Sequence, residues 1–393
     1  MKIGLITGEY PPQQGGVGDF TRELARALNA QGHLTQVITT TASGQRSAFN
    51  QSQEDSIVVQ RVIGSWGVRC WGEIAEVAKR EQFDVLSIQY EPAAYAMRIG
   101  VNFLPSAWVR RLIKVPIVTT FHDLLVPYLF PKAGSLRWKI VEYLARHSDA
   151  VIVTNGEDRA RLANLPSPIP NLDTIPIGSN IDPLKKGKFD RAAERARWGI
   201  RPAERVLGYF GFLSLSKGGS DLLQALKALI DQDLPIKLLL IGGRTGSSDP
   251  TNAEYAAQVD QLVELLRMQE RVIATGYLEP VDVSRALGAC DVLVLPYVDG
   301  ASLRRGSLHA AIAHGRAIVT TEPRYPIEGL KHEESVLYVP PNDPQALAAA
   351  VQRVLQDSVL REHLQSAVRQ AAKLYTWDRI AAQTAEVFKQ VKA

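Results

Sequence analysis

Cationic side chains in the second half of the chain stand beside glycines, where they could bind an anion. Lys217 follows a predicted strand that ends at Gly211, and two arginines precede the predicted helix Leu308–His314. Ammonium and guanidinium groups pair with phosphate oxygens, and a helix N-terminus adds a favourable field. We therefore predict a phosphate site, with solvated loop cations as the alternative. Its residues are Lys217, Gly218, Arg304, Arg305, Gly306 and Ser307.

Two further strand ends of the same half carry glycines. Gly242 ends one predicted strand, and Tyr277 and Leu278 follow another. Doubly wound sheets bind their ligands at the carboxyl ends of their strands. These residues are therefore candidate ligand contacts, and ordinary tight turns are the alternative.

The first half has a glycine-rich loop of its own. Gly15 and Gly16 lie between the predicted strand Ile3–Thr7 and the predicted helix Asp19–Gln31. Glycines let the backbone approach a ligand and expose N–H groups to it, so an anionic or diphosphate group would suit this loop. The spacing is not the dinucleotide G-x-G-x-x-G, and a flexible connection is the alternative.

A histidine and an aspartate follow the predicted strand Ile117–Thr120. This position places His122 and Asp123 at the carboxyl edge of the first sheet. A histidine there could position an acceptor hydroxyl or share its proton. We treat the pair as candidate catalytic residues, and a histidine satisfied within a loop is the alternative.

Short apolar strands alternate with longer helical stretches throughout the chain, which predicts an α/β fold. A proline-rich segment from Leu165 to Asp182 separates two such series and predicts two domains. The last segment, Gln345–Lys392, is helical in period with a break near Leu374–Trp377, and its final helix could return to the first domain. The predicted strands of the two series are Ile3–Thr7, Thr35–Thr40, Val85–Gln89, Ile117–Thr120 and Val151–Thr154, then Val206–Phe210, Lys237–Ile241, Arg271–Thr275, Val292–Leu295, Ala317–Thr321 and Val336–Tyr338.

Composition limits the class of protein. The 393 residues are 46% hydrophobic and 22% charged with a net charge of +4, and the basic residues form no long run, which argues against nucleic acid as a partner. Cys70 and Cys290 are far apart, so neither a disulfide framework nor a zinc site is expected. The chain enters a strand at once and has no apolar run of membrane-spanning length, from which we expect a cytoplasmic protein.

In its motifs and their order the chain resembles the GT-B glycosyltransferases, and in particular glycosyltransferase family 4, also called group 1. The likeness spans nearly the whole chain. It rests on Pro11-Pro12, Gly15-Gly16-Val17-Gly18, Gly32-His33, Thr120-Phe121-His122-Asp123, Ile175 to Asp182, Lys217-Gly218 and Ala313 to Val319.

The resemblance implies a GT-B architecture, with two Rossmann-like, doubly wound domains that face each other across a cleft. Residues 1–173 with 377–393 would bind the acceptor, and residues 184–372 would bind a nucleotide sugar. The implied activity is a metal-independent, retaining hexosyltransferase of polysaccharide biosynthesis that needs no cofactor. The acceptor would be a glycan, a lipid-linked molecule or a small molecule. Lys217 would face the diphosphate, Gly16 would lie beside the phosphates or the donor sugar, and His122 would lie near the reacting carbon.

The chain departs from this family at three positions. Phe212 stands where the family commonly has an arginine, and Ser302 and Ala310 occupy the two glutamate positions of the Glu-x7-Glu signature. Arg304 or Arg305 could replace the missing phosphate contact. Asp299 could take over the sugar contact, and Ser302 and His309 are nearby substitutes.

Two alternative functions and one surface feature were also considered. The missing carboxylates would also suit a non-catalytic binding or scaffolding protein on a GT-B frame, whereas a Rossmann oxidoreductase lacks its fingerprint in both halves. The segment Met97–Lys114 mixes apolar and basic residues around Pro105 and could contact the inner membrane face. A core-facing helix with a basic outer face is the alternative.

Overall fold

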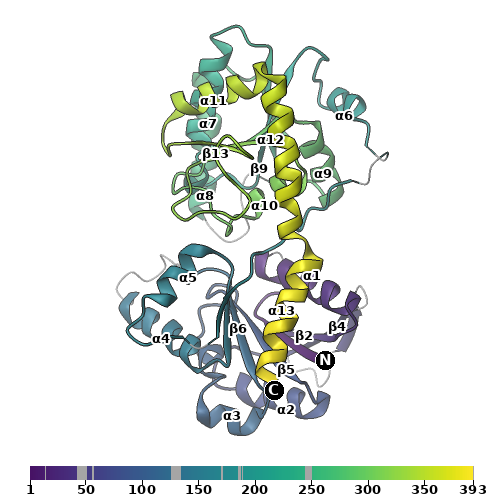
Figure 1. The fold of residues 1–393 in the computed structure, drawn as a ribbon, viewed down its shortest axis with the longest axis vertical. Coiled ribbons are helices and arrows are strands. Elements are labelled where there is room, and N and C mark those ends of the chain that lie inside the picture. The colour runs from purple at the N-terminus through teal and green to yellow at the C-terminus, as the bar shows by residue number, and fades with distance from the viewer. Residues whose placement is uncertain are drawn as a thin grey trace. The chain divides into compact units, whose positions relative to one another are not determined.

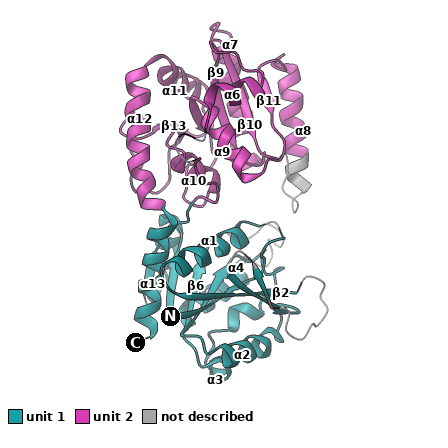
Figure 2. Cartoon of the chain, turned by 90° about the vertical axis from the view of Figure 1, so that its right-hand side faces the viewer, with its two compact units in different colours: residues 1–178, 376–393 teal, residues 179–375 magenta. Residues whose placement is uncertain are grey.

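The chain folds into two compact units (Figure 2). The computed structural model describes residues 1–13, 15–41, 51–54, 57–124, 134–169, 171–184, 187, 189–243 and 250–392. Unit 1 comprises Met1–Gly178 and Thr376–Ala393, and unit 2 comprises Ser179–Tyr375. The chain therefore passes between the units twice, once in the proline-rich segment and once before its last helix.

Unit 1 is built on an eight-stranded sheet with the order β3-β4-β2-β1-β5-β6-β7-β8. All pairs are parallel except β3 with β4. The strand order reverses between β1 and β5. The five predicted strands of the first half are confirmed, whereas β3, β4 and β8 were not predicted. The strands are β1 Lys2–Thr7, β2 Leu34–Thr40, β3 Gln51–Glu54, β4 Ile57–Ile63, β5 Val85–Tyr90, β6 Ile117–Phe121, β7 Ala150–Val153 and β8 Leu172–Thr174.

Helices cover both faces of this sheet, as the unbroken apolar strands require. One face packs against α1 and α13, which lie side by side (Figure 1). The other packs against α2, α3, α4 and α5. The helices are α1 Gly16–Ala30, α2 Cys70–Glu81, α3 Ala107–Ile113, α4 Gly134–His147, α5 Gly156–Ala163 and α13 Trp377–Lys392, with a 3-10 turn η1 at Gly100–Phe103.

Unit 2 contains a six-stranded parallel sheet with the order β11-β10-β9-β12-β13-β14, which reverses between β9 and β12. All six strands predicted for this half are confirmed: β9 Arg205–Phe210, β10 Ile236–Ile241, β11 Val272–Ala274, β12 Val292–Leu295, β13 Ala317–Thr321 and β14 Leu337–Val339. The helices are α6 Arg191–Arg197, α7 Gly219–Ile230, α8 Pro250–Leu265, α9 Pro280–Ala289, α10 Gly306–Ala313, α11 Pro344–Gln356 and α12 Ser358–Ala371, with 3-10 turns η3 Leu215–Lys217 and η4 Ala372–Tyr375. Both units are thus Rossmann-like.

The helical C-terminal segment breaks where its sequence predicted, and α13 returns to unit 1. Trp377 packs with Ile175 and Ile177 against the α1 face of the first sheet. A second break, between α11 and α12, was not predicted. There the carboxylate of Asp357 accepts a hydrogen bond from the Leu360 N–H at 2.9 Å and so caps α12.

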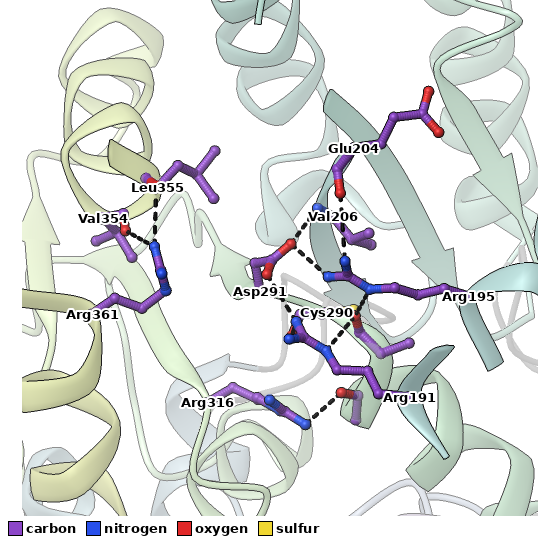
Figure 3. A network of polar contacts seen from close by, with 12 residues as sticks. Arg191, Arg195, Glu204, Val206, Cys290, Asp291, Arg316, Val354, Leu355 and Arg361 are labelled. Carbon is purple, nitrogen blue, oxygen red and sulfur yellow. Dashed lines mark hydrogen bonds and ion pairs between the residues drawn. The ribbon is translucent and has the colours of Figure 1, made fainter. Parts of the chain in front are cut away.

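Arginines of α6 hold this helix against the amino edge of the sheet of unit 2 through a network of polar contacts (Figure 3). Asp291, which is 5% exposed and directly precedes β12, accepts hydrogen bonds from Arg191 at 2.8 Å and Arg195 at 2.7 Å. The Val206 N–H also donates to it at 2.8 Å. Burial acts to raise the pKa of Asp291, but this amide and the two guanidinium groups outweigh it and lower the pKa below the ordinary value. The arginines also donate to the carbonyls of Ala289 and Cys290 at the end of α9, where the helix dipole favours cations.

Candidate functional site

The cationic residues of unit 2 meet at the carboxyl ends of β9 and β12, where the strand order reverses. Doubly wound sheets bind ligands in this crevice. The loop after β9 is held to the loop after β12 because the Val298 N–H donates to the Ser216 carbonyl at 3.0 Å. Gly218 is in the left-handed region with φ of 68°, and a Cβ there would lie 1.8 Å from the Pro296 carbonyl oxygen. Only glycine therefore lets the two loops approach so closely.

The ammonium group of Lys217 lies over the end of β9. A Cβ on Gly211 would be 2.8 Å from Lys217 Nζ, so this glycine makes room for the amine. No residue that the structure describes forms a hydrogen bond or an ion pair with Nζ, which lies 5.9 Å from the centre of the Phe212 ring. Burial, followed by the charge of Arg305, lowers the pKa of Lys217 to about 8. A half-buried cation without an anionic partner is poised to bind one.

Arg305 has a partner within the protein. Its Nη2 donates to both carboxylate oxygens of Asp299 at 2.6 and 2.7 Å, and its Nη1 donates to Ser216 Oγ at 3.2 Å. The guanidinium also lies 5.3 Å from the centre of the Tyr297 ring. Because both oxygens of Asp299 are used in this way, a sugar hydroxyl would have to share them with Arg305.

The helix α10 starts directly after this ion pair. The side chain of its N-cap residue, Arg305, does not cap the first turn, and the N–H groups of Gly306 and Ser307 are therefore directed out of the helix. Ser307 is buried, and its hydroxyl is 2.8 Å from the Tyr297 hydroxyl. Ser302 Oγ accepts from the backbone N–H and the Nε of Arg304, both at 3.4 Å. The predicted phosphate-binding residues are thus brought together on adjacent loops.

Gly211, Gly242 and Gly276 follow the ends of β9, β10 and β11 and form a glycine shelf, a surface without side chains. A Cβ on Gly242 would lie 3.6 Å from the Gly211 carbonyl oxygen, and Gly242 bridges to Gly276. Tyr277 is 66% exposed beside this shelf, as a ring that stacks on a nucleobase would be. Leu278 is partly buried and packs against the hydrophobic core of unit 2.

His309, a suggested substitute for the missing carboxylates, does not face the site. Its ring is 1% exposed, donates from Nε2 to the Leu303 carbonyl at 2.9 Å and lies edge-on to Tyr375. Burial lowers the pKa of His309 to about 4, so the ring is neutral. The interpretation of His309 as a ligand contact was wrong: the residue holds the backbone of the loop before α10 from within the core.

In unit 1 a carboxylate that the sequence analysis missed caps α1. Glu9 Oε1 accepts hydrogen bonds from the N–H groups of Val17 at 3.0 Å and Gly18 at 3.3 Å. A Cβ on Gly15 would lie 2.1 Å from this carboxylate, whereas one on Gly16 would meet no atom within 4 Å. The protein's own anion therefore occupies much of the N-terminus of α1, and Gly16 is the more open of the two predicted glycine contacts. An acidic residue just before the glycine loop was the available signal.

His122 is held at the carboxyl edge of the first sheet. Its backbone N–H donates to the Tyr90 carbonyl at 3.0 Å, and its ring Nε2 is 3.1 Å from Gln89 Oε1. Because the Gln89 amide nitrogen donates to Ser87 Oγ, its oxygen accepts, and this assigns the proton of His122 to Nε2. Burial lowers the pKa of His122 to about 3. The neutral ring can position a hydroxyl, but it carries no extra proton to give at neutral pH.

Asp123 lies at a small cavity of about 50 Å³ between the loop after β5 and α4. Burial raises the pKa of the neighbouring Glu91, and the charges of Glu9 and Asp123 add to this effect. Glu9 and Asp123 therefore both lie close enough to Glu91 to affect its pKa, and all three carboxylates belong to unit 1.

Comparison with known proteins gives two family matches. Residues 15–178 match the model described as "Glycosyl transferase 4-like domain", and residues 204–357 match "Glycosyl transferases group 1". The chain is also similar to the alpha-monoglucosyldiacylglycerol synthase of Streptococcus pneumoniae. The two are 25% identical over 80% of this chain and 71% of the synthase.

Solved structures share the fold along the whole chain. The sucrose-phosphate synthase of Thermosynechococcus elongatus has a TM-score of 0.75 at 21% identity and covers 99% of this chain and 98% of its own. HepE of Anabaena, solved with UDP and glucose, has a TM-score of 0.74 at 18% identity, over 99% and 100% of the two chains. These likenesses confirm two Rossmann-like units in tandem.

Proposed function

Because the chain belongs to the group 1 glycosyltransferases, has their GT-B fold and uses a nucleotide sugar, we propose that it transfers a hexose with retention of configuration. The acceptor in this proposal is a hydroxyl of a glycan, a lipid-linked molecule or a small molecule. The observation that carries the proposal is the ammonium of Lys217 beside the N-terminus of α10, a cation that has no hydrogen-bond or ion-pair partner among the residues that the structure describes.

In this proposal the donor diphosphate lies across the β9 and β12 loops. Lys217 neutralises it as a point charge, and the N–H groups of Gly306 and Ser307 donate to its oxygens. The bond between the anomeric carbon and the diphosphate oxygen breaks, and negative charge develops on the leaving diphosphate. A fixed cation stabilises this charge more in the transition state than in the ground state.

The positions where this family carries its signature carboxylates offer no nucleophile in unit 2, which is consistent with retention without a covalent intermediate. Asp299 is tied to Arg305, and the signature positions are a serine and the buried Ala310. We propose that the acceptor oxygen attacks from the face that the diphosphate leaves, while a diphosphate oxygen takes the acceptor's proton. His122 would hold the acceptor hydroxyl as a neutral hydrogen-bonding group.

We propose that no metal or other cofactor takes part. Lys217 and the α10 N-terminus supply positive charge where a metal would otherwise be needed. Within the described ranges, no three His, Cys, Asp or Glu residues are grouped so that they could hold a metal ion. Activity that survives EDTA treatment unchanged would support this part of the proposal, and its loss would contradict it.

A nucleotide-binding panel tests the function directly. Thermal unfolding is followed with UDP, GDP, ADP, TDP and NAD, all at the same concentration. A nucleotide whose concentration is 100 times its dissociation constant stabilises the fold by about 2.7 kcal/mol. We expect a shift with one nucleoside diphosphate and none with NAD. If no nucleoside diphosphate gives a shift, the scaffold function replaces the transferase.

We also propose that unit 1 contacts the inner face of the cytoplasmic membrane through α3. None of the helices in the described residues has the length and apolar content to cross a bilayer. Trp108 and Leu112, one turn apart on α3, are 50% and 59% exposed, and Arg111 and Lys114 beside them are exposed. An apolar pair with basic neighbours is typical of a surface that rests on anionic lipid.

The double variant Leu112→Ser/Arg111→Ala is expected to bind vesicles of anionic lipid at least tenfold more weakly in a sedimentation assay at low salt. The estimate combines about 1 kcal/mol per basic residue with the lost burial of a leucine. The matched control is Leu265→Ser/Arg267→Ala in unit 2, because Leu265 is 78% exposed. Equal sedimentation of both variants and the parent would remove the membrane contact from the proposal.

A further inference from the structure

Gln89 is a fully buried polar residue near the carboxyl end of the central strand β5 in unit 1. It pairs with Thr7 of β1 on one side and with Thr120 of β6 on the other, so the sheet encloses it from both sides. A buried amide costs free energy unless its polar atoms form hydrogen bonds. The partners of this side chain therefore indicate what it does.

The amide of Gln89 is oriented from within the sheet and points its oxygen at His122. Its Nε2 donates to Ser87 Oγ at 2.9 Å, and Ser87 is a fully buried residue on the same face of β5. The backbone is fixed as well, because the Tyr95 hydroxyl donates to the Gln89 carbonyl at 2.9 Å. Gln89 Oε1 then lies 3.1 Å from the imidazole Nε2 of His122. An amide oxygen only accepts hydrogen bonds, so this ring nitrogen carries the proton.

Aromatic packing fixes the plane of the same imidazole. The ring of Phe20 in α1 lies edge-on to the ring of His122, with 4.5 Å between the centroids and an angle of 71° between the planes. Trp377, at the start of α13, packs against Phe20 with 5.3 Å between their centroids. His122 is partly exposed, and its Nδ1 has no hydrogen-bond partner among the residues that the structure describes. One ring nitrogen is thus committed to Gln89, and the other is open to a ligand.

We infer that Gln89 is a positioning residue, which holds His122 as the tautomer with its proton on Nε2. Nδ1 then presents a lone pair and accepts a hydrogen bond from a hydroxyl of the substrate. A carbonyl or phosphate oxygen at this place would meet a second acceptor and would be disfavoured. The inference rests on the proposed function, in which His122 holds the acceptor hydroxyl, and it adds the direction of that hydrogen bond and the residue that sets it.

The variant Gln89→Met is expected to reverse the tautomer. Methionine is unbranched and adaptable, so the ring keeps its packing. The buried Nε2–H would lose its acceptor, whereas Nδ1 reaches the surface and can donate to water, so the proton should move to Nδ1. A substrate hydroxyl would then meet a donor in place of an acceptor.

NMR spectroscopy of the whole protein with ¹⁵N-labelled histidine tests the tautomer without any substrate, and the signals lost in His122→Gln identify His122. In the parent protein Nε2 should have the chemical shift of a protonated nitrogen and Nδ1 that of an unprotonated one. This pattern should not change between pH 5 and pH 9, because burial lowers the pKa of His122 to about 3. The inference is wrong if the parent carries the proton on Nδ1, or if Gln89→Met leaves the proton on Nε2.

A second variant, Gln89→Glu, keeps the acceptor and adds a charge. Its carboxylate should leave the proton on Nε2 and raise the pKa of His122 by about 1 to 3 pH units, as an opposite charge within hydrogen-bond distance does. Its activity relative to the parent should therefore be constant at high pH and fall as the pH drops through the raised pKa, where Nδ1 becomes protonated. Glu91 and Asp123, the carboxylates nearest in sequence, are present in both proteins, so the difference reports position 89. A ratio that does not depend on pH would contradict the inference.

Activity is measured as hydrolysis of the glucose donor whose base the binding panel identifies, with water in place of the acceptor hydroxyl. Gln89→Met should lower kcat about tenfold or more and leave KM for the donor within about twofold, because Lys217 and α10 bind the diphosphate. Gln36→Met is the control, since Gln36 is a buried glutamine of the same sheet whose side chain bonds to Glu81 and Gln60. It should change neither kcat nor the His122 signals. A parent protein that binds no nucleotide would contradict the proposed function instead, since the NMR result does not depend on a donor.

Discussion

Replacing Asp291 by asparagine is expected to lower the free energy of unfolding by about 3 to 5 kcal/mol, the typical cost of breaking a buried ion pair from one side. Asp291 is 5% exposed and Arg195 is 12% exposed, so the guanidinium would keep its desolvation cost and lose its counter-charge. The Val206 N–H would also face a weaker acceptor. Urea unfolding followed by circular dichroism measures the change.

The pH dependence gives this prediction a sign. The pKa of Asp291 is lowered in the folded protein, so its contribution is complete above the unfolded pKa of about 3.9 and is lost as the pH falls through the folded value. The gap between the parent and Asp291→Asn should therefore be full at pH 7 and narrow below about pH 4. Asp282→Ala is the control, because Asp282 forms its ion pairs with Arg197 and Arg285 on the surface, where they contribute about 1 kcal/mol or less. Equal losses for the two variants would contradict the burial argument.

The fold was predictable where strands are apolar throughout. Runs such as Val292–Leu295 are buried along their whole length, and burial on both faces leaves no polar position to confuse the pattern. The strand β4, Ile57–Ile63, was missed because Gln60 and Arg61 interrupt its apolar residues. The structure explains Gln60, which is 1% exposed and is satisfied by hydrogen bonds with Gln36 and Arg80. Such pairings join segments far apart in the chain, and no local pattern contains them.

The candidate site also contains residues that the sequence predicts and residues that only the fold brings together. Lys217 and Gly218 could be proposed from the sequence because a strand, a glycine and a cation follow one another in the chain. The partner of Arg305 could not be chosen, since the sequence does not say which carboxylate its guanidinium meets. Arg98 belongs to no motif, and only the fold shows that it lines two cavities of unit 1.

The variant Lys217→Ala is expected to bind its nucleoside diphosphate about 10 to 150 times more weakly, which corresponds to the roughly 1.5 to 3 kcal/mol of a hydrogen bond with a charged group. The fold should not suffer, because the ammonium it removes has no partner among the described residues and is partly desolvated. Calorimetric titration with the nucleotide identified by the binding panel measures the affinity, and thermal unfolding measures the stability. Lys227→Ala is the matched control, since Lys227 lies on α7 and is paired with Asp231.

The affinity of the parent protein should also fall as the pH rises through about 8. The pKa of Lys217 is lowered to about 8, so its ammonium is charged below this pH and increasingly neutral above it. A ligand that needs the charged form then loses about tenfold in affinity for each further pH unit. The loss ends at the pKa that Lys217 has in the complex, which the bound phosphate raises. Phosphate groups have second pKa values near 6 and are fully ionised in this range, so the slope reports the protein. Lys217→Ala should show no such slope. A slope that persists in the variant would assign the titration to another group and would remove Lys217 from the centre of the donor site.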